Sequence, residues 1–407
     1  MSSRVLLILP SRTYRARAFL EACRVLGVEV VVAGESGSTL GHLHPEQELL
    51  IDPGRPREAA ERAQRRARRH PFRAVIPADE AGVLAAAEIA ARLKLPGNPP
   101  GAVAATRDKL RLRQALAGSG LTQPAWTAWE EGHEPAFDRF PCVVKPLDQA
   151  ASRGVVRADD RDDLERAGRR VRALLRQDPA CAPAPGQATL LIEEFIPGPE
   201  VALEGLFWEH QLRRLAVYDK PEPLDGPFFE ESIYTVPSEL AADLQGRLWD
   251  LVERAVTVLG LGFGAIHAEL RLGPPGPVLV DLASRSIGGR CSRVLTFACG
   301  LSLEALIVQA ALGAPVPDLS LAPGCQGVLM LPSPRSGRLR AVPGRAAAAT
   351  LPGVSGIELT IPLGGPIVPW PEGDRYLGFV FASGASSADV VATLRRAQQE
   401  LGIAIEP

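Results

Sequence analysis

Two carboxylates occupy matching positions on two predicted strands that are joined by a tight turn. The stretch GAIHAELRLGPPGPVLVDLASR predicts a hairpin centred on Pro275, in which Glu269 lies opposite Asp281 and His267 lies opposite Ala283. Side chains alternate faces along a strand, and opposed Cβ atoms lie about 4.5–5.5 Å apart, so the two acids can hold one cation. Mg²⁺ commonly takes one or two carboxylates together with substrate phosphates. An exposed hairpin with ordinary charges is the alternative, because sequence alone does not fix the register.

A lysine marks a second candidate site. The chain has 45 Lys and Arg residues, but only four are lysines: Lys94, Lys109, Lys145 and Lys220. Lys145 ends an apolar run and precedes the small-residue loop DQAASRG. A compact ammonium there can contact a phosphate while N–H groups of the loop add further donors. A lysine at the surface with its stem packed on apolar groups is the alternative, and no GxxxxGK[ST] motif is present.

The stretch LLIEEFIPGPE predicts a strand that ends in two acids and is followed by a bend and Glu200. An extended segment offers N–H and C=O groups to an adenine edge, and a following carboxylate can take ribose hydroxyls. A strand that simply turns is the alternative reading.

The surrounding pattern predicts mixed α/β and α+β architecture in more than one domain. The first 100 or so residues alternate buried-type strands with amphipathic helices, which favours a small open parallel sheet. We predict a helix from Thr106 to about Gly118, then β-rich sequence, a long helix over ELAADLQGRLWDLVERAVTVLG and a small C-terminal lobe. The expected domains are 1–105, 106–312 and 313–407.

Composition excludes several classes of protein. The formal net charge of −2 argues against a nucleic-acid-binding surface. Six cysteines without a CxxC pair favour reduced thiols rather than a zinc site or a disulfide framework. The absence of an 18-residue apolar run and of a signal-peptide pattern predicts a cytoplasmic protein without membrane contact.

The order and spacing of these features resemble the ATP-grasp superfamily over nearly the whole chain. The similarity is strongest to the ATP-dependent carboxylate–amine ligases of the L-amino-acid ligase group. The stretches AVIPADEAGVLAAAEIAARLKLPGNPP and TRDKLRLRQALAGSGLTQPA are similar to the family's N-terminal domain where it enters the nucleotide domain. The stretch GVLMLPSPRSGRLRAVPG resembles the family's C-terminal lobe. The resemblance implies an ATP-grasp fold with a Rossmann-like N-terminal domain and a C-terminal α+β lobe.

The resemblance also implies ATP and Mg²⁺, with Mn²⁺ as an alternative ion. Lys109 and Lys145 resemble the two lysines that contact nucleotide phosphates. The segment from Gln149 resembles the loop that closes over those phosphates, and it includes Ser152, Arg153 and Gly154.

Further roles follow from the same resemblance. Glu193 and the backbone of the next three residues, Glu194, Phe195 and Ile196, resemble the adenine-binding hinge, and Glu200 resembles the ribose-binding acid. Glu269 and Asp281 resemble the two metal-binding acids, and His267 on the same face is assigned to the nucleotide site. Arg285 resembles the arginine that steadies the transferring phosphoryl group.

Two departures from the family pattern are present. The family's metal strand usually reads acid-x-Asn-x-Arg, whereas Ala283 occupies the Asn position here. The phosphate loop is usually rich in glycine, but DQAASRG contains one. The first departure removes a metal ligand, and the second implies stiffer closure.

The implied reaction is amide formation between a carboxylate and an amine, both expected to be amino acids, through an acyl phosphate. The loop DKPEPLDGPFFEE is the expected substrate wall, in which Lys220 meets a carboxylate and Glu230 or Glu231 holds an ammonium. A surface loop stiffened by its prolines is the alternative. Arg293 is a candidate for binding the substrate carboxylate, or else a plain surface charge. Bicarbonate activation of the biotin-carboxylase type and nucleotide binding without turnover remain open. Since dimers are the commonest homo-oligomers, a homodimer is the assembly to consider first.

Overall fold

The structure is a computed structural model that describes residues 3–10, 13–35, 47–177 and 186–407. Its first sheet is parallel and has the strand order β3 (Glu48–Leu50), β2 (Glu29–Gly34), β1 (Arg4–Ile8) and β4 (Ala74–Pro77). The apolar strand residues are buried between helices α1 (Ala16–Val25), α3 (Pro56–Ala67) and α4 (Val83–Leu93). The parallel sheet expected for this region is confirmed.

The predicted helix after residue 106 is two helices. Helix α5 (Pro100–Arg107) ends before Asp108, whose backbone is extended, and α6 (Lys109–Leu116) begins directly after it. The Asp108 carboxylate accepts hydrogen bonds from the N–H groups of Leu110 and Arg111, which are donors without an intrahelical partner. This cap holds Lys109 at the first position of α6.

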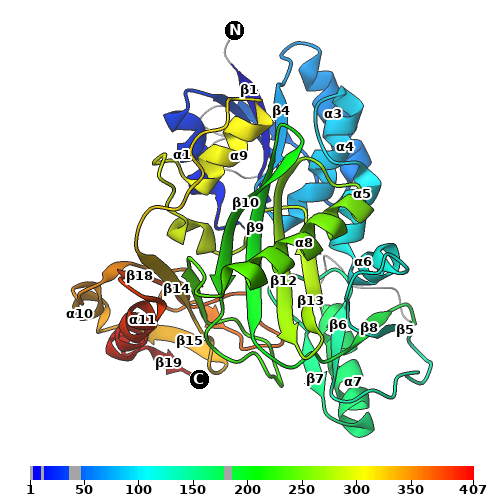
Figure 1. Cartoon of the computed structure of the whole chain (residues 1–407), viewed down its shortest axis with the longest axis vertical. Coiled ribbons are helices and arrows are strands. Elements are labelled where there is room, and N and C mark those ends of the chain that lie inside the picture. Colours follow the sequence, from blue (N-terminus) through cyan, green and yellow to red (C-terminus); the bar gives the residue numbers. More distant parts are fainter. Residues whose placement is uncertain (1–2, 11–12, 36–46, 178–185) are drawn as a thin grey trace.

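A small antiparallel sheet forms a separate lobe at the lower right of Figure 1. Its strand order is β5 (Trp126–Trp129), β8 (Leu190–Glu194), β6 (Cys142–Pro146) and β7 (Val156–Ala158), and helix α7 (Arg161–Gln177) covers it. Gly168 allows close packing here, since a Cβ at this position would lie 2.2 Å from the Trp129 ring.

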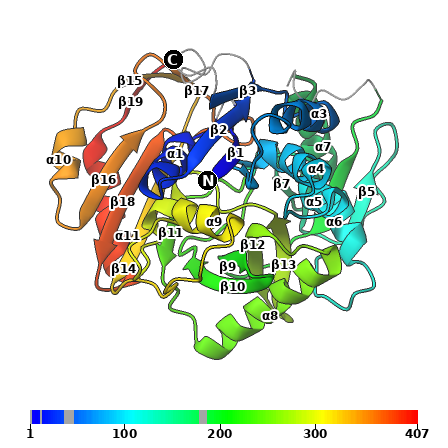
Figure 2. The same ribbon diagram turned by 90° about the horizontal axis from the view of Figure 1, so that it is seen from above.

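A large sheet of eight strands runs through the middle of the molecule (Figures 1 and 2). Its order is β13 (Gly276–Ala283), β12 (Gly264–Gly273), β9 (Glu200–Trp208), β10 (Gln211–Asp219), β11 (Ile233–Val236), β14 (Cys325–Leu331), β18 (Gly378–Gly384) and β16 (Val354–Leu359). Along β9, Val201, Leu203 and Phe207 pack in the cluster that includes helix α8 (Ala242–Leu259). The alternate residues Leu206 and Trp208 pack in the cluster that includes α9 (Leu303–Ala311). This part of the sheet is therefore covered on both faces, which explains its nearly continuous apolar sequence.

The last three strands of the large sheet come from the C-terminal residues. Strands β14, β18 and β16 continue it beyond β11, so the expected division after residue 312 separates strands that belong to one sheet. Helix α11 (Ser387–Leu401) packs on these strands through Val390 and Leu394. Strands β15 (Gly337–Ala341), β17 (Pro366–Ile367) and β19 (Ala404–Glu406) form a separate three-stranded sheet, and helix α10 (Arg345–Ala349) packs against α11 and β16.

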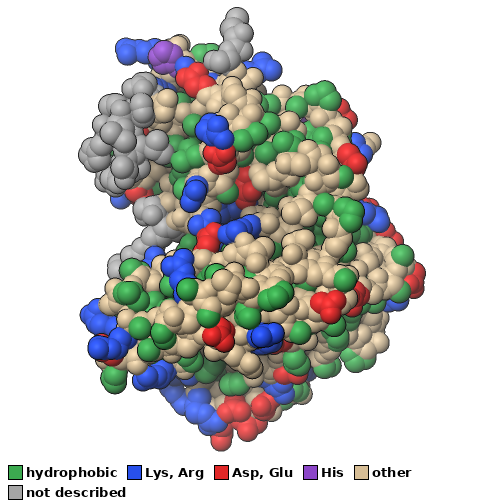
Figure 3. Space-filling model, turned by 90° about the vertical axis from the view of Figure 1, so that its left-hand side faces the viewer, with side chains coloured by type: hydrophobic (Ala, Val, Ile, Leu, Met, Phe, Trp, Pro, Cys, Tyr) green, Lys and Arg blue, Asp and Glu red, His purple; other side chains and the backbone are tan. Residues whose placement is uncertain are grey.

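Charged side chains of both signs are interspersed over the face drawn in Figure 3. The described part of the chain contains no helix that is both long and apolar enough to span a bilayer. Five cysteines are free thiols, and Cys181 lies outside the described residues.

We predict that Asp108→Ala lowers the free energy of unfolding by about 1 kcal/mol, because two N–H groups at the start of α6 lose their acceptor. Denaturant unfolding followed by circular dichroism measures this loss. Asp108→Ser keeps a capping oxygen and should recover most of the stability. Equal stability of the alanine variant and the parent protein would show that the cap contributes nothing.

Candidate active site

A cavity of about 310 Å³ lies where the large sheet, the small sheet and the N-terminal region meet. It is the place to which most of the candidate residues point. Those lining it are Lys109, Lys145, Ser152, Glu193, Glu194, Phe195, Ile196, Glu200, Glu231, His267, Glu269, Asp281 and Arg285.

The two hairpin acids meet in the predicted register. Glu269 of β12 pairs with Asp281 of β13, and His267 pairs with Ala283. A register shift follows directly after Glu269, so the hairpin is irregular only on the turn side of the acids. All four side chains line the cavity wall. The pair thus offers hard oxygen donors of the kind that Mg²⁺ binds.

Lys220 lies at the centre of a cluster of acids next to this pair. Its Nζ is 2.6 Å from Glu200, 3.0 Å from Glu231 and 2.9 Å from Glu269. Burial alone would lower the pKa of Lys220, but the three carboxylates raise it well above its usual value. Burial would raise the pKa of Glu269, yet Lys220 and His267 hold it well below the ordinary range, so Glu269 is ionised at neutral pH. The oxygens of the three carboxylates lie within 4.8 Å of one another, which is close enough to hold a cation, while Arg271 and His267 also contact Glu200 and Glu269 at 3.9 and 3.7 Å.

Lys145 belongs to a second buried network. Its Nζ is 2.5 Å from Glu193 Oε2, while Arg113 donates from Nε to Glu193 Oε1. Arg113 also donates to the carbonyl oxygens of Leu279 and Val280 on β13, at 3.2 and 2.5 Å. Burial would raise the pKa of Glu193, but the charges of Arg113 and Lys145 lower it to about 2. This network ties the hinge strand β8 to the metal-candidate strand β13.

Lys109 and the phosphate-loop candidate are held together. The Lys109 Nζ donates to the carbonyl of Gln149 at 2.7 Å, and the backbone N–H of Lys109 donates to the carbonyl of Leu147 at 2.9 Å. Ala151, Ser152 and Gly154 have φ of 54°, 55° and 74°. Two residues with a Cβ thus adopt the left-handed conformation that glycine adopts without strain. The loop's low glycine content therefore leaves two residues with a Cβ in a conformation that glycine would adopt more easily.

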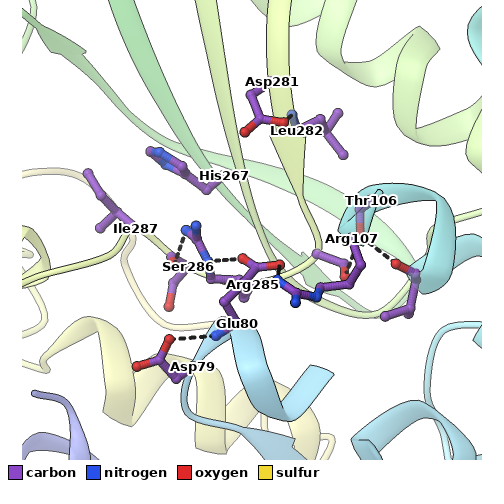
Figure 4. A network of polar contacts seen from close by, with 12 residues as sticks. Asp79, Glu80, Thr106, Arg107, His267, Asp281, Leu282, Arg285, Ser286 and Ile287 are labelled. Carbon is purple, nitrogen blue, oxygen red and sulfur yellow. Dashed lines mark hydrogen bonds and ion pairs between the residues drawn. The ribbon is translucent and has the colours of Figure 1, made fainter. Parts of the chain in front are cut away.

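Arg285 lies between the hairpin and the N-terminal region (Figure 4). Its Nε donates to the Glu80 carboxylate at 2.5 Å, and Arg107 Nη1 lies 3.1 Å from the same carboxylate. Burial would lower the pKa of Arg285, but Glu80 raises it above its usual value. The guanidinium is therefore a permanent positive charge on the cavity wall.

Behind His267 lies a carboxylate that is completely buried. Glu204 Oε2 is 3.3 Å from His267 Nδ1 and accepts a hydrogen bond from the N–H of Ile287 at 2.9 Å. Burial raises the pKa of Glu204, while His267 counteracts the rise. Glu204 thus orients the imidazole and anchors the start of the Ile287–Gly289 turn that lines the cavity.

Five candidates lie outside the cavity lining. Lys220, expected to meet a substrate carboxylate, is paired with three carboxylates of the protein itself. Glu230 Oε1 accepts from the N–H of Ser333, and Arg293 pairs with Glu358 at 2.6 Å on the surface. Arg153 and Gly154 bond to the C-terminal segment at Glu372 and Pro371. The structure therefore favours Glu231 over Glu230 as the cavity acid and does not bring Arg293 to the other candidates.

Sequence reasoning missed several residues of the cavity and its support. Glu204 could have been identified from the sequence, because it is the one acid inside the apolar run VALEGLFW. Arg113 lies four residues after Lys109, which places both on the same helix face, so the sequence spacing could have identified Arg113 as well. Glu80, Arg107, Tyr14 and Tyr376 line the cavity only because distant segments meet, and no local pattern marks them.

Two protein-family models match parts of this chain. Residues 138–294 match the ATP-grasp domain, and residues 329–406 match L-amino acid ligase C-terminal domain 2. The crystal structure of an L-amino acid ligase from Bacillus licheniformis superposes with a TM-score of 0.83 at 25% identity, covering 100% of this chain and 99% of that one.

Two curated relatives extend the comparison. An uncharacterized protein, y4rH, of Sinorhizobium fredii is 27% identical over 81% of this chain and 69% of its own length. Carnosine synthase 1 of Gallus gallus is 29% identical over 57% of this chain but only 26% of its own length.

The fold and the domain match define the class of protein: the chain is an ATP-grasp ligase, a class that forms carbon–nitrogen bonds. Within that class it belongs to the L-amino acid ligase family, whose C-terminal domain it carries.

Glu193 should make stability depend on pH. We predict that Glu193→Gln lowers the melting temperature strongly at pH 7, because Arg113 and Lys145 lose the charge that compensates them. The folded-state pKa of Glu193 is depressed to about 2, so its stabilising contribution is present above the unfolded value near 4.5. That contribution is lost as the pH falls from 4.5 toward 2, and the difference between variant and parent should shrink over this window.

Melting curves at pH 7, 5 and 3.5 measure the effect. Glu194→Gln is the matched control, since the neighbouring Glu194 has only a partly exposed contact with Arg139 at 3.5 Å. A difference for Glu193→Gln that stays constant across the series would contradict the assignment.

Proposed function

We propose that the protein uses ATP to activate the carboxylate of one amino acid and joins it to the amine of a second, releasing ADP and phosphate. The observation that carries the proposal is the facing of Glu269 and Asp281 across the hairpin in the cavity that Lys109 and Lys145 also line. Carboxylates for a divalent cation and ammonium groups for phosphates are the parts that phosphoryl transfer requires.

The nucleotide would lie between the small and large sheets. The N–H groups of Glu194 and Phe195 donate to the carbonyls of Ala125 and Pro141. An adenine edge would therefore be read by the Ile196 N–H and the carbonyl oxygens of this segment. Glu200 lies at the start of β9, where a ribose would follow.

The residues present fit a magnesium ion. Glu269 and Asp281 would hold it, because both offer oxygen donors on one face and Glu269 is kept ionised. When bound, Mg²⁺ would neutralise part of the triphosphate charge. Ala283 supplies no side-chain oxygen, and its cross-strand neighbour is His267.

Arg285 and the Gly288–Gly289 turn would receive the reacting groups. A carboxylate oxygen of the first amino acid attacks the γ-phosphorus, which forms an acyl phosphate and releases ADP. The fixed charge of Arg285 would stabilise the transferring phosphoryl group. The amine nitrogen of the second amino acid then forms the C–N bond as the C–O bond to phosphate breaks. Phosphate leaves, and the nitrogen releases a proton to solvent.

Glu231 would hold the ammonium of the first amino acid. It lines the cavity, Tyr234 donates a hydrogen bond to it, and its carboxylate lies within 4.8 Å of those of Glu200 and Glu269. Enclosure of the cavity by the two sheets would keep water from hydrolysing the acyl phosphate.

A phosphate-release screen over pairs of amino acids, with products identified by mass, tests the proposal. We expect release with at least one pair and a product equal in mass to the two amino acids less one water. Bicarbonate with biotin belongs in the panel as the other carboxylate-activating chemistry. Binding of MgADP without phosphate release across the panel would favour the reading in which the missing oxygen at Ala283 has abolished turnover.

We predict that Glu269→Gln and Lys145→Ala each reduce ADP formation by a factor of at least about 10², as expected when a group that stabilises transferring charge is removed. ADP formation is followed by a coupled assay, with circular dichroism as the check of folding. Glu253→Gln on the exposed face of α8 and Lys94→Ala are the matched controls and should keep parental turnover. Near-parental turnover in a folded Glu269→Gln or Lys145→Ala variant would remove that residue from the site.

A further inference from the structure

A segment of the C-terminal lobe bonds directly to the phosphate-loop candidate. The indole Nε1 of Trp370 donates to the carbonyl of Ala151 at 2.9 Å. The N–H of Gly154 donates to the carbonyl of Pro371, also at 2.9 Å, and Arg153 Nε donates to the carbonyl of Glu372 at 3.2 Å. Three consecutive residues of the C-terminal lobe thus bond to the loop between β6 and β7.

The loop has a reason to need outside support. Ala151 and Ser152 both adopt left-handed φ, a conformation that costs residues with a Cβ energy and persists only where the surroundings impose it. The bond from Trp370 falls on Ala151 itself, and the bond to Pro371 falls two residues after Ser152. The C-terminal segment therefore acts on the strained part of the loop.

Trp370 is itself fixed from the other side. The residue is 4% exposed, and its ring stacks on Tyr376 at a centroid distance of 4.8 Å. Tyr376 in turn makes an edge contact with Phe379 of β18 at 5.9 Å. The indole is thereby connected to the large sheet through rigid rings, so its N–H is aimed before any ligand binds.

An ion pair between α7 and the same C-terminal segment contributes less to holding the loop. Arg170 of α7 and Glu372 lie 2.6 Å apart, but both side chains are more than a third exposed. Exposed pairs of this kind contribute little because water and salt screen them. The hydrogen bonds to the loop backbone, one of them from a buried indole, are the stronger contacts.

We propose that Trp370 is a positioning residue for the nucleotide phosphates, so that the C-terminal lobe is a working part of the ATP site. The inference rests on the proposed function, because it assumes that the 149–154 loop covers the phosphates. Trp370 touches no reacting atom; it acts by holding the loop backbone where phosphate oxygens would meet it.

Trp370→Phe tests the role, because it keeps an aromatic ring against Tyr376 and deletes the indole donor. We expect the KM for ATP to rise roughly two- to tenfold, the effect of one lost hydrogen bond, with a smaller change in kcat. The Kd of MgADP should rise in parallel, and hydrogen–deuterium exchange should become faster in peptides covering 149–154.

Trp208→Phe is the matched control. The buried Trp208 Nε1 also donates to a backbone carbonyl, that of Ala314 at 2.7 Å, but on the side of the large sheet that faces α9. This variant should lose similar thermal stability while the KM for ATP and the exchange of the loop stay unchanged. Equal effects of both variants would mean that Trp370 is merely structural and would overturn the proposal.

Parental KM, Kd and exchange in a folded Trp370→Phe variant would also overturn it. Should that variant not fold, the parent protein still decides the matter. Without nucleotide, the amide of Gly154 should exchange slowly because the Pro371 carbonyl accepts a hydrogen bond from it, and fast exchange would refute the contact. Hydrogen exchange and MgADP binding can be measured without turnover. If Trp370→Phe loosens the loop but the parent protein joins no pair of amino acids, the proposed function is wrong while this inference stands.

Discussion

Backbone pairing of β12 with its two neighbours is the constraint on which the candidate site depends. Strand β9 on one side sets His267 against Glu204 and Glu269 against Ala202, while β13 on the other sets the same two residues against Ala283 and Asp281. A slip of one residue in either ladder would turn the carboxylates to the opposite face, which packs on α8. The buried apolar residues on that face make such a slip costly. The hydrophobic core thus determines which side chains reach the cavity.

The charged groups around the cavity form three networks of ion pairs. In two of them one acid contacts two cations, and in the third one cation contacts three acids. Glu193 is held by Arg113 and Lys145, Glu80 is held by Arg285 and Arg107, and Lys220 is held by three acids. Buried ion pairs are weak contributors to stability, since desolvation offsets much of their attraction. Their value here is preorganisation: the charges that would meet phosphates and an ammonium are fixed before those ligands arrive.

Much of this site was predictable because it is local in sequence. The register at the two hairpin acids agrees with strand alternation around one turn, although alternation alone left a slip open, and Lys145 and the two acids of β8 follow from the ends of apolar runs. The break at Asp108 was missed because the amphipathic pattern continues across it, and only the capping geometry reveals it. The contacts of Glu80 with Arg285 and of Trp370 with Ala151 join residues about 200 positions apart, and no periodicity or spacing encodes them. The sequence left Arg293 open between substrate binding and a plain surface charge, and its side chain pairs with Glu358 of β16.

The continuity of the large sheet across β11 and β14 has a consequence for protein engineering. Four register pairs join these strands, and Met330 on β14 reaches the cavity wall. A chimera that takes its C-terminal residues from a relative would have to preserve the pairing of β11 with β14. Otherwise the edge of β11 would be unpaired and prone to aggregation. Module exchange in this scaffold is therefore better done by cutting within loops that leave β11 and β14 in one parent.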